Sequence, residues 1–404
     1  GGIALDARDD TRGVGLGVAA GASTGGTGIS AANGVVVSNG AVDALVSSNA
    51  ALVSTGDVFV NAKRSQELAG LAYHVAVASS VGVGGGLGLG VDKGVTTAQA
   101  DGVTISATGD VALRAGNNTK VVTSAVGGAY GGSVGATGSV AMTFKSDIVL
   151  AEVNNSTISA DDAVLVEALN GGRLDGVGGA EESFFGQFDQ ISGGITYGGT
   201  AGIGISVSVI KSTSVVDAVI RGNSTVTADG LGGGIATLAR SESGTQYLDR
   251  QGAMRRGVSV IADNSTEVNT VAITGALSQG GGIAFQVPVI LLKDTVRARI
   301  LGTTSVRPSV TSGSDLAVFA GNATRVQTLS AVVGGGLTFG VGALNEVFVI
   351  EKTTQASISD AVVSATRDLT IDAITPESIR TVSGAGICLY HFRESRGTGF
   401  LILA

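Results

Sequence analysis

The sequence predicts an all-β fold, a repetitive β-solenoid, and three observations lead to that prediction. A V-x-V-x-A strand pattern recurs along the chain, glycine-rich stretches recur at the same phase, and no repeat shows a helical period. The apolar stretches alternate with small polar residues, which is the period of a half-buried strand. A chain of such repeats buries its core by stacking each repeat on the next.

The strand pattern marks a unit of about 53 residues. Its copies are IALDA, VFVNA, VALRA, VLVEA, IATLA, LAVFA and LTIDA, which close at Ala7, Ala62, Ala115, Ala168, Ala239, Ala320 and Ala373. Four of the six intervals between these alanines are 53 to 55 residues, and the other two are 71 and 81. The spacing therefore predicts one scaffold with two insertions, in which IATLA is a scaffold strand.

The glycine-rich stretches, such as VGVGGGLGLG at 81–90 and GGAYGGSVGATG at 127–138, need a packing reason because glycine weakens an isolated strand. We expect either a close approach of neighbouring backbones or a bend repeated in every unit. A nucleotide-binding loop is not indicated, because no helix follows any copy. The Gly, Asp, Asn and Thr residues before each strand pattern are typical of corners.

A unit of this length exceeds an ordinary solenoid coil, so we expect two or three coils in each unit. At about 4.8 Å per coil, seven units would form a rod of roughly 70 to 100 Å. The alternative is a flattened β-sandwich array of antiparallel hairpins, one pair per unit. The sequence alone does not separate these two arrangements.

Composition excludes several classes of protein. A mean hydropathy of +0.39 with 14% charged residues excludes a disordered chain. No uninterrupted apolar run reaches 18 residues, so no transmembrane segment is expected. The net charge of −8 argues against a nucleic-acid partner. With one cysteine there is no internal disulfide, and stability must come from stacking.

Nothing in the sequence predicts catalytic, cofactor-binding or metal-ligating residues, so the chain is not expected to be an enzyme. His74 has no nucleophile and acid partner at a readable spacing. GGLGLGVD at 85–92 places Gly90 where a calcium-binding nonapeptide requires aspartate. Five Asn-x-Ser/Thr sequons are interpreted as corner turns: Asn117, Asn155, Asn223, Asn264 and Asn322.

The two places that break the repeat are the candidate partner-binding loops, because loops on a rigid scaffold often carry function. The first, near 171–194, contains Phe184, Phe185 and Phe188; the second, near 241–270, contains Arg250, Arg255 and Arg256. These residues would meet a glycan, a matrix protein or an anionic surface. Equally, the phenylalanines could fold over the end of a sheet and the arginines could lie in a solvated excursion.

Composition changes again after residue 386. The segment 387–404 holds the only cysteine, Cys388, and also His391. We therefore expect 1–386 to form a single solenoid and 387–404 to be an aberrant tail outside the fold, which leaves an open coil end suited to self-association. The chain starts within the pattern at Gly1, so we expect a fragment of a longer protein.

The succession GGAYGGSVGATGSVAM, DIVLAEV, NSTISA and DDAVLVEA resembles the repeats of large bacterial filamentous adhesins of the leukotoxin type. It is similar more broadly to filamentous haemagglutinin-like proteins and autotransporter passengers. The resemblance covers most of 1–386, and it implies an extracellular or cell-surface β-solenoid that acts in adhesion and virulence, without catalytic residues.

The expected function is therefore a structural stalk or passenger segment that displays loops. The alternative is an extracellular polysaccharide-binding or polysaccharide-degrading β-helix protein, which several convergent Asp, Lys or Arg side chains along one face would favour.

Overall fold

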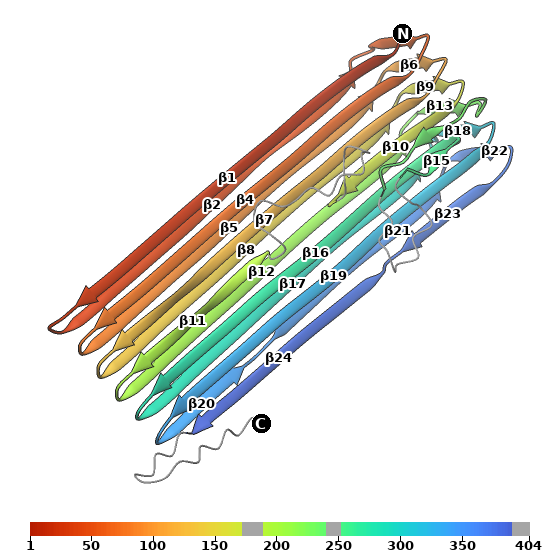
Figure 1. Cartoon of the computed structure of the whole chain (residues 1–404). Helices are drawn as coiled ribbons and strands as arrows, with labels where there is room; N and C mark the ends of the chain where they lie inside the picture. The colour runs from red at the N-terminus through yellow and green to blue at the C-terminus, as the bar shows by residue number, and fades with distance from the viewer. Residues whose placement is uncertain (172–188, 240–251, 390–404) are drawn as a thin grey trace.

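The computed structural model describes residues 1–171, 189–239 and 252–389. Within these ranges every regular element is a β-strand, and no helix is present. The long strands of successive units lie side by side, and the short strands gather at one end of the molecule (Figure 1). The predicted all-β solenoid is confirmed.

Each unit is one coil made of two long strands and one short strand. The first three coils are β1 (Ile3–Ser23), β2 (Thr27–Ser47), β3 (Ala51–Ser54); β4 (Val58–Ala78), β5 (Val81–Asp101), β6 (Thr104–Ala107); and β7 (Val111–Gly131), β8 (Val134–Asn154), β9 (Thr157–Ala160). The fourth coil is β10 (Ala163–Asn170), β11 (Gln190–Gly198), β12 (Ala201–Arg221) and β13 (Thr225–Ala228). The fifth is β16 (Gly257–Ser278), β17 (Gly281–Leu301) and β18 (Ser309–Ser312). The sixth and seventh are β19 (Asp315–Gly336), β20 (Phe339–Leu344), β21 (Val347–Ser359), β22 (Val362–Ala365); and β23 (Leu369–Ile374), β24 (Glu377–Leu389).

Equivalent strands of successive coils pair in parallel and form three sheets. The first sheet has the order β1-β4-β7-β10-β16-β19-β23, the second β2-β5-β8-β12-β17-β20, and the third β22-β18-β13-β9-β6-β3. β11 and β24 complete the first sheet, and β21 completes the second. Parallel pairing between units identifies a solenoid rather than an array of antiparallel hairpins.

The expected two or three coils per unit, and the long rod, are wrong. Val58 pairs with Val111, one whole unit further along the chain, so a unit makes a single turn. Seven coils at about 4.8 Å give a stack of only about 34 Å, whereas a 21-residue strand at about 3.3 Å per residue is about 70 Å long. The molecule is therefore wider across its strands than it is tall along its stack.

The half of each coil beside the third sheet, here called the wide half, encloses the main apolar core. Val58, Val60 and Ala62 face inward from β4, and the equivalent Val111, Leu113 and Ala115 face inward from β7. These side chains are almost wholly buried. The V-x-V-x-A pattern is thus the inward row that packs between three sheets.

The other half of each coil, here called the thin half, brings the two long sheets into backbone contact. A Cβ atom on Gly34 would lie 1.9 Å from the carbonyl oxygen of Leu71, and one on Gly88 would lie 2.3 Å from that of Ser124. Only glycine fits at these inward positions. The expectation that glycine serves a close approach of backbones is confirmed, and the thin half ends in the turns that join the long strands, here called the tip.

The first insertion interrupts a long strand of the first sheet. Asn170 pairs with Asn117 and Gln190 pairs with Thr123 of β7. Gly171 and Asp189 still hydrogen-bond to β7, so three strand positions are replaced by the segment 172–188.

The second insertion contains the short hairpin β14 (Ile235–Ala236) and β15 (Met254–Arg255), which packs on the outer face of the first sheet. The prediction that IATLA, residues 235–239, is a scaffold strand is wrong. Val258 of β16 pairs with Val164, so VSVIA at 258–262 occupies that place. VSVIA has the same alternation as IATLA, and the pattern could not distinguish them.

The expected fold boundary after residue 386 falls three residues short. β24 continues to Leu389, and Ile387, Cys388 and Leu389 pair in register with Gly334, Gly335 and Gly336 of β19. The rest of the expected tail, including His391, lies outside the described residues.

Candidate functional site

A column of asparagines runs through the molecule between the two long sheets. One register position is occupied by Asp9 in the first coil and by Arg64 in the second. In the third to sixth coils the same position is occupied by Asn117, Asn170, Asn264 and Asn322. Each of the four side chains is at most 3% exposed. The amides therefore sit in the buried interior of the solenoid.

Each of the first three asparagines donates a hydrogen bond to the next one along the stack. The Nδ2-to-Oδ1 distances are 2.9 Å from Asn117 to Asn170, 2.8 Å from Asn170 to Asn264 and 3.0 Å from Asn264 to Asn322. The ladder satisfies polar groups that would otherwise be costly to bury. Since a one-residue slip would turn an amide outward, the ladder also fixes the register of the coils.

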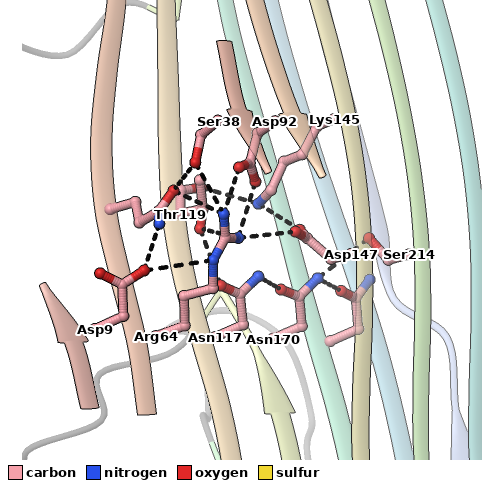
Figure 2. A network of polar contacts seen from close by, with 12 residues as sticks. Asp9, Ser38, Arg64, Asp92, Asn117, Thr119, Lys145, Asp147, Asn170 and Ser214 are labelled. Atoms are coloured by element: carbon pink, nitrogen blue, oxygen red, sulfur yellow. Dashed lines mark hydrogen bonds and ion pairs between the residues drawn. The ribbon is translucent and has the colours of Figure 1, made fainter. Parts of the chain in front are cut away.

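Arg64 takes the place of asparagine in the second coil and is fully buried. Its guanidinium binds Asp92 of the facing sheet at 2.5 Å (Nη2–Oδ1) and 3.0 Å (Nη1–Oδ2). It also donates to Gln66 at 2.7 Å and to Thr119 at 3.1 Å (Figure 2). Gly94 makes room, because a Cβ there would lie 2.0 Å from Arg64 Nη1.

A second ion pair lies beside this cluster, on the third coil. Lys145 Nζ lies 3.0 Å from Asp147 Oδ2 and donates to the carbonyl of Thr119 at 2.9 Å. Burial raises the pKa of the Asp147 carboxyl above its ordinary value, while Lys145 acts to lower it. Figure 2 shows these groups converging with Arg64 and Asp92 between the sheets.

The same polar layer continues to the sixth coil. Thr266 donates to Asp294 at 3.2 Å, and Lys352 Nζ donates to the backbone carbonyl of Asn322 at 2.9 Å. Burial raises the pKa of Asp294 and lowers that of Lys352. The layer thus contains three buried acidic side chains, of Asp92, Asp147 and Asp294, beside three basic side chains, of Arg64, Lys145 and Lys352.

His74 occupies a cradle of glycines in the thin half. Its side chain is 1% exposed, and Nε2 lies 2.9 Å from Thr137 Oγ1. Cβ atoms on Gly84, Gly86 or Gly127 would lie 2.4 to 2.6 Å from the ring. Burial lowers the pKa of His74, so the imidazole is held neutral inside the slab.

The structure describes only two of the six predicted partner-binding residues. Arg255 is partly buried in β15 beside Glu167 and Asp315, and burial lowers the pKa of its guanidinium. Arg256 follows it and is exposed. The two side chains therefore differ in environment. The remaining candidates lie outside the described residues: Phe184, Phe185, Phe188 and Arg250.

Glu167 anchors the second insertion to the scaffold. Its fully buried carboxylate accepts hydrogen bonds from the backbone N–H groups of Leu238 at 2.9 Å and Ala239 at 3.1 Å. The Thr237 hydroxyl also donates to it, and Arg114 Nε donates at 3.1 Å. The hairpin is therefore fixed on the outer face of the first sheet.

The asparagine column was misread from the sequence. Asn117, Asn264 and Asn322 are inward residues in the middle of strands, not corner turns, whereas Asn155 does occupy a turn with φ of 49°. A signal existed, because each ladder asparagine follows the closing alanine of the strand pattern by two residues, as in Ala320 and Asn322.

Over residues 1–171, 189–239 and 252–389, no group of three or more His, Cys, Asp or Glu side chains is placed to hold a metal ion. No described helix has the length and apolar character needed to cross a membrane. The members of the buried layer bind mainly one another. Its hydrogen bonds fix the register of the coils, and its ion pairs compensate buried charges.

Comparisons with known proteins found no match: no family model, no curated protein and no solved structure matches this chain.

Proposed function

We propose that this chain is a structural, non-catalytic module of a secreted or surface-anchored bacterial adhesin, which displays loops from a broad β-solenoid. The observation that carries the proposal is the placement of the two insertions. The first leaves from the first sheet between Asn170 and Gln190, and the second docks through Glu167 on the outer face of that same sheet. Both insertions are therefore attached to the first sheet.

The scaffold supports this proposal because it is rigid around both insertions. Asn170 donates to Asn264 of the next coil directly beside the first insertion. The buried charges pair with one another, as in Arg64 with Asp92, and leave the outer face to make external contacts. The stack gains little height per residue, so the module fits a broad display platform better than a long spacer.

The proposed partner is a glycan or a matrix protein outside the cell, bound through the insertions and without a cofactor. Phe184, Phe185 and Phe188 would supply an aromatic surface, and Arg250 and Arg256 would supply positive charge. Aromatic and arginine side chains are the types enriched where proteins bind partners.

Replacing each insertion separately tests this proposal. Residues 172–188 are replaced by Thr-Lys-Val, the three residues at 119–121 of the third coil, which restores an uninterrupted long strand. Residues 240–251 are replaced by a short Gly-Asn turn that closes the hairpin. Each chain is incubated with a glycan array and with immobilised matrix proteins, and circular dichroism checks that the β-solenoid is retained.

We expect at least one replacement to abolish the binding shown by the parent chain. Equal binding by the parent and both replaced chains would contradict display by the loops. Release of hydrolysis or elimination products from a polysaccharide would instead favour the enzymatic alternative.

A further inference from the structure

The thin half of the solenoid is nearly free of Asp, Glu, Lys and Arg in six successive coils; the exceptions are Lys211 and Glu346, which lie level with Leu291 and Pro288 of the fifth coil. The uncharged stretches occupy residues 13–42, 68–91, 121–144, 190–210, 268–292 and 326–345. Each runs up one long strand, around the tip and down the next. The charged residues therefore keep to the wide half and to a belt across the middle of the slab.

Both outer faces of the thin half are apolar and exposed to solvent. On the first sheet Val18 is 71% exposed and Ile195 is 65% exposed; on the second sheet Ile29 is 69% and Ile205 is 46% exposed. Eleven residues by six strands cover about 1,000 Å² on each face, at about 3.3 Å per residue and 4.8 Å per strand. The largest apolar patch on an ordinary soluble monomer is about 300 to 600 Å².

The charged region begins at the same level on both faces. On the first sheet a column of alternating charge closes the apolar surface: Arg12, Glu67, Lys120, Glu267 and Arg325. On the second sheet Lys93 and Lys293 lie at one register position, which is across the slab from the charged column of the first sheet. Lys293 also forms an ion pair with Glu351 at 3.2 Å. The boundary therefore lies near one level on both faces, within a few residues from coil to coil.

The tip satisfies its own backbone. Gly132 N donates to the Ala78 carbonyl at 3.1 Å, Gly199 N to the Gly131 carbonyl at 3.1 Å, and Thr200 N to the Ser133 carbonyl at 2.7 Å. From the second coil on, each turn thus bonds to the turn of the preceding coil. Internal satisfaction of backbone groups is a condition for entering a hydrocarbon phase. The stacked strands meet it everywhere except along the outer edges of the first and last coils.

We infer that the thin half is a lipid-binding edge, which enters the apolar layer of a phospholipid bilayer while the charged belt stays at the interface. A bilayer contacts both faces of an inserted edge, and the apolar surface likewise covers both faces down to about one level. A single second copy would cover one face and leave the other exposed. The charge-free length of about 11 residues is about 36 Å, close to the roughly 30 Å of a hydrocarbon core.

Flotation with uncharged phosphatidylcholine vesicles tests this inference. We expect the chain to float with the vesicles and to remain bound at high salt, because no charge enters the contact. Ile195→Lys on the first sheet and Ile205→Lys on the second should each lower the vesicle-bound fraction about tenfold or more, since a lysine facing lipid is costly. Val362→Lys is the matched control, because Val362 is 58% exposed on the third sheet, at the opposite end of the coil.

A second measurement needs no substitution. The chain has no tryptophan, and Tyr73, Tyr130 and Tyr197 lie on the outer face of the thin half. Vesicles brominated in the acyl chains should therefore quench tyrosine fluorescence more than unlabelled vesicles do. This decides the question even if a lysine variant fails to fold, as judged by circular dichroism.

Absence of both flotation and quenching would overturn the inference. Flotation that neither Ile195→Lys nor Ile205→Lys weakens would also overturn it. Sensitivity at one face only, with a lipid-free dimer in analytical ultracentrifugation, would assign that face to a second copy instead.

Discussion

Arg64 and Asp92 meet across the two long sheets with two hydrogen bonds, of 2.5 and 3.0 Å, and both side chains are at most 1% exposed. They belong to facing strands of the same coil. The pair thus ties the two walls of the slab together at the point where the apolar core gives way to the thin half.

We expect Asp92→Leu to lower the free energy of unfolding of the second and third coils by about 3 to 5 kcal/mol, because it leaves Arg64 buried without its principal partner. Urea unfolding followed by circular dichroism, with hydrogen exchange to locate the affected coils, measures the effect. The double variant Arg64→Met with Asp92→Leu should be more stable than the single variant. A single variant as stable as the exposed control Asp10→Asn would contradict this account.

The asparagine ladder should be most sensitive in its middle. Asn170 donates to one neighbour and accepts from the other, whereas Asn322 accepts from Asn264 and its own Nδ2 has no partner. We expect Asn170→Ala to cost about 2 to 3 kcal/mol and Asn322→Ala about half as much, because the first leaves two buried groups unpaired. If urea unfolding shows that both substitutions lower the free energy of unfolding equally, the number of ladder hydrogen bonds lost does not determine the effect.

Two glycines of β5 should respond in opposite ways to one added methyl group. A Cβ on Gly88 would lie 2.3 Å from the Ser124 carbonyl oxygen, while nothing lies within 4 Å of a Cβ on Gly85. Gly88→Ala should therefore force the sheets apart and destabilise by several kcal/mol, about the scale of core overpacking or more. Gly85→Ala should be neutral or stabilise by about 0.5 kcal/mol. Thermal denaturation of the two variants makes the comparison, and similar melting would contradict the close-approach role.

Asp110 should make the protein more stable in mild acid. Burial, together with the charges of Asp162 and Asp57, raises the pKa of its carboxyl to about 6 from 3.8. Between these values the folded state binds more protons than the unfolded state, so the contribution of this group to stability falls as pH rises.

Asp110→Asn keeps an oxygen that can accept from Ala163 N, at 3.1 Å in the parent, and removes the charge. We expect the variant to gain stability relative to the parent at pH 8 and to lose that gain by pH 4. Urea midpoints across this pH range give the difference, and a difference that does not change with pH would refute the assignment.

The repeat, the all-β fold and the role of glycine could be predicted from the sequence because they depend on local alternation and constant phase. The number of coils in each unit could not be predicted, because strands of 21 residues are longer than the usual 3 to 10 residues. The polar layer escaped prediction for a different reason. Arg64 meets Asp92 only after the chain has turned at the tip, and no local pattern sets that distance across the slab.

The ladder asparagines show the same limit. Asn117 and Asn155 both begin Asn-x-Ser/Thr triplets, yet one is a buried strand residue and the other a corner. Position within the coil separates them, and that position follows from the parallel register rather than from neighbouring residues.

Because the same asparagine recurs in the third to sixth coils, any two of these coils can form the same amide hydrogen bond when they are stacked on each other. If the fourth coil were lost by recombination between repeats, Asn117 would face Asn264 and could form the same bond that each now makes with Asn170. A duplicated coil would likewise insert one more amide into the column. Gene rearrangement can therefore lengthen or shorten this part of the chain without leaving a mismatched junction, while the second coil, which holds Arg64, is fixed in its place.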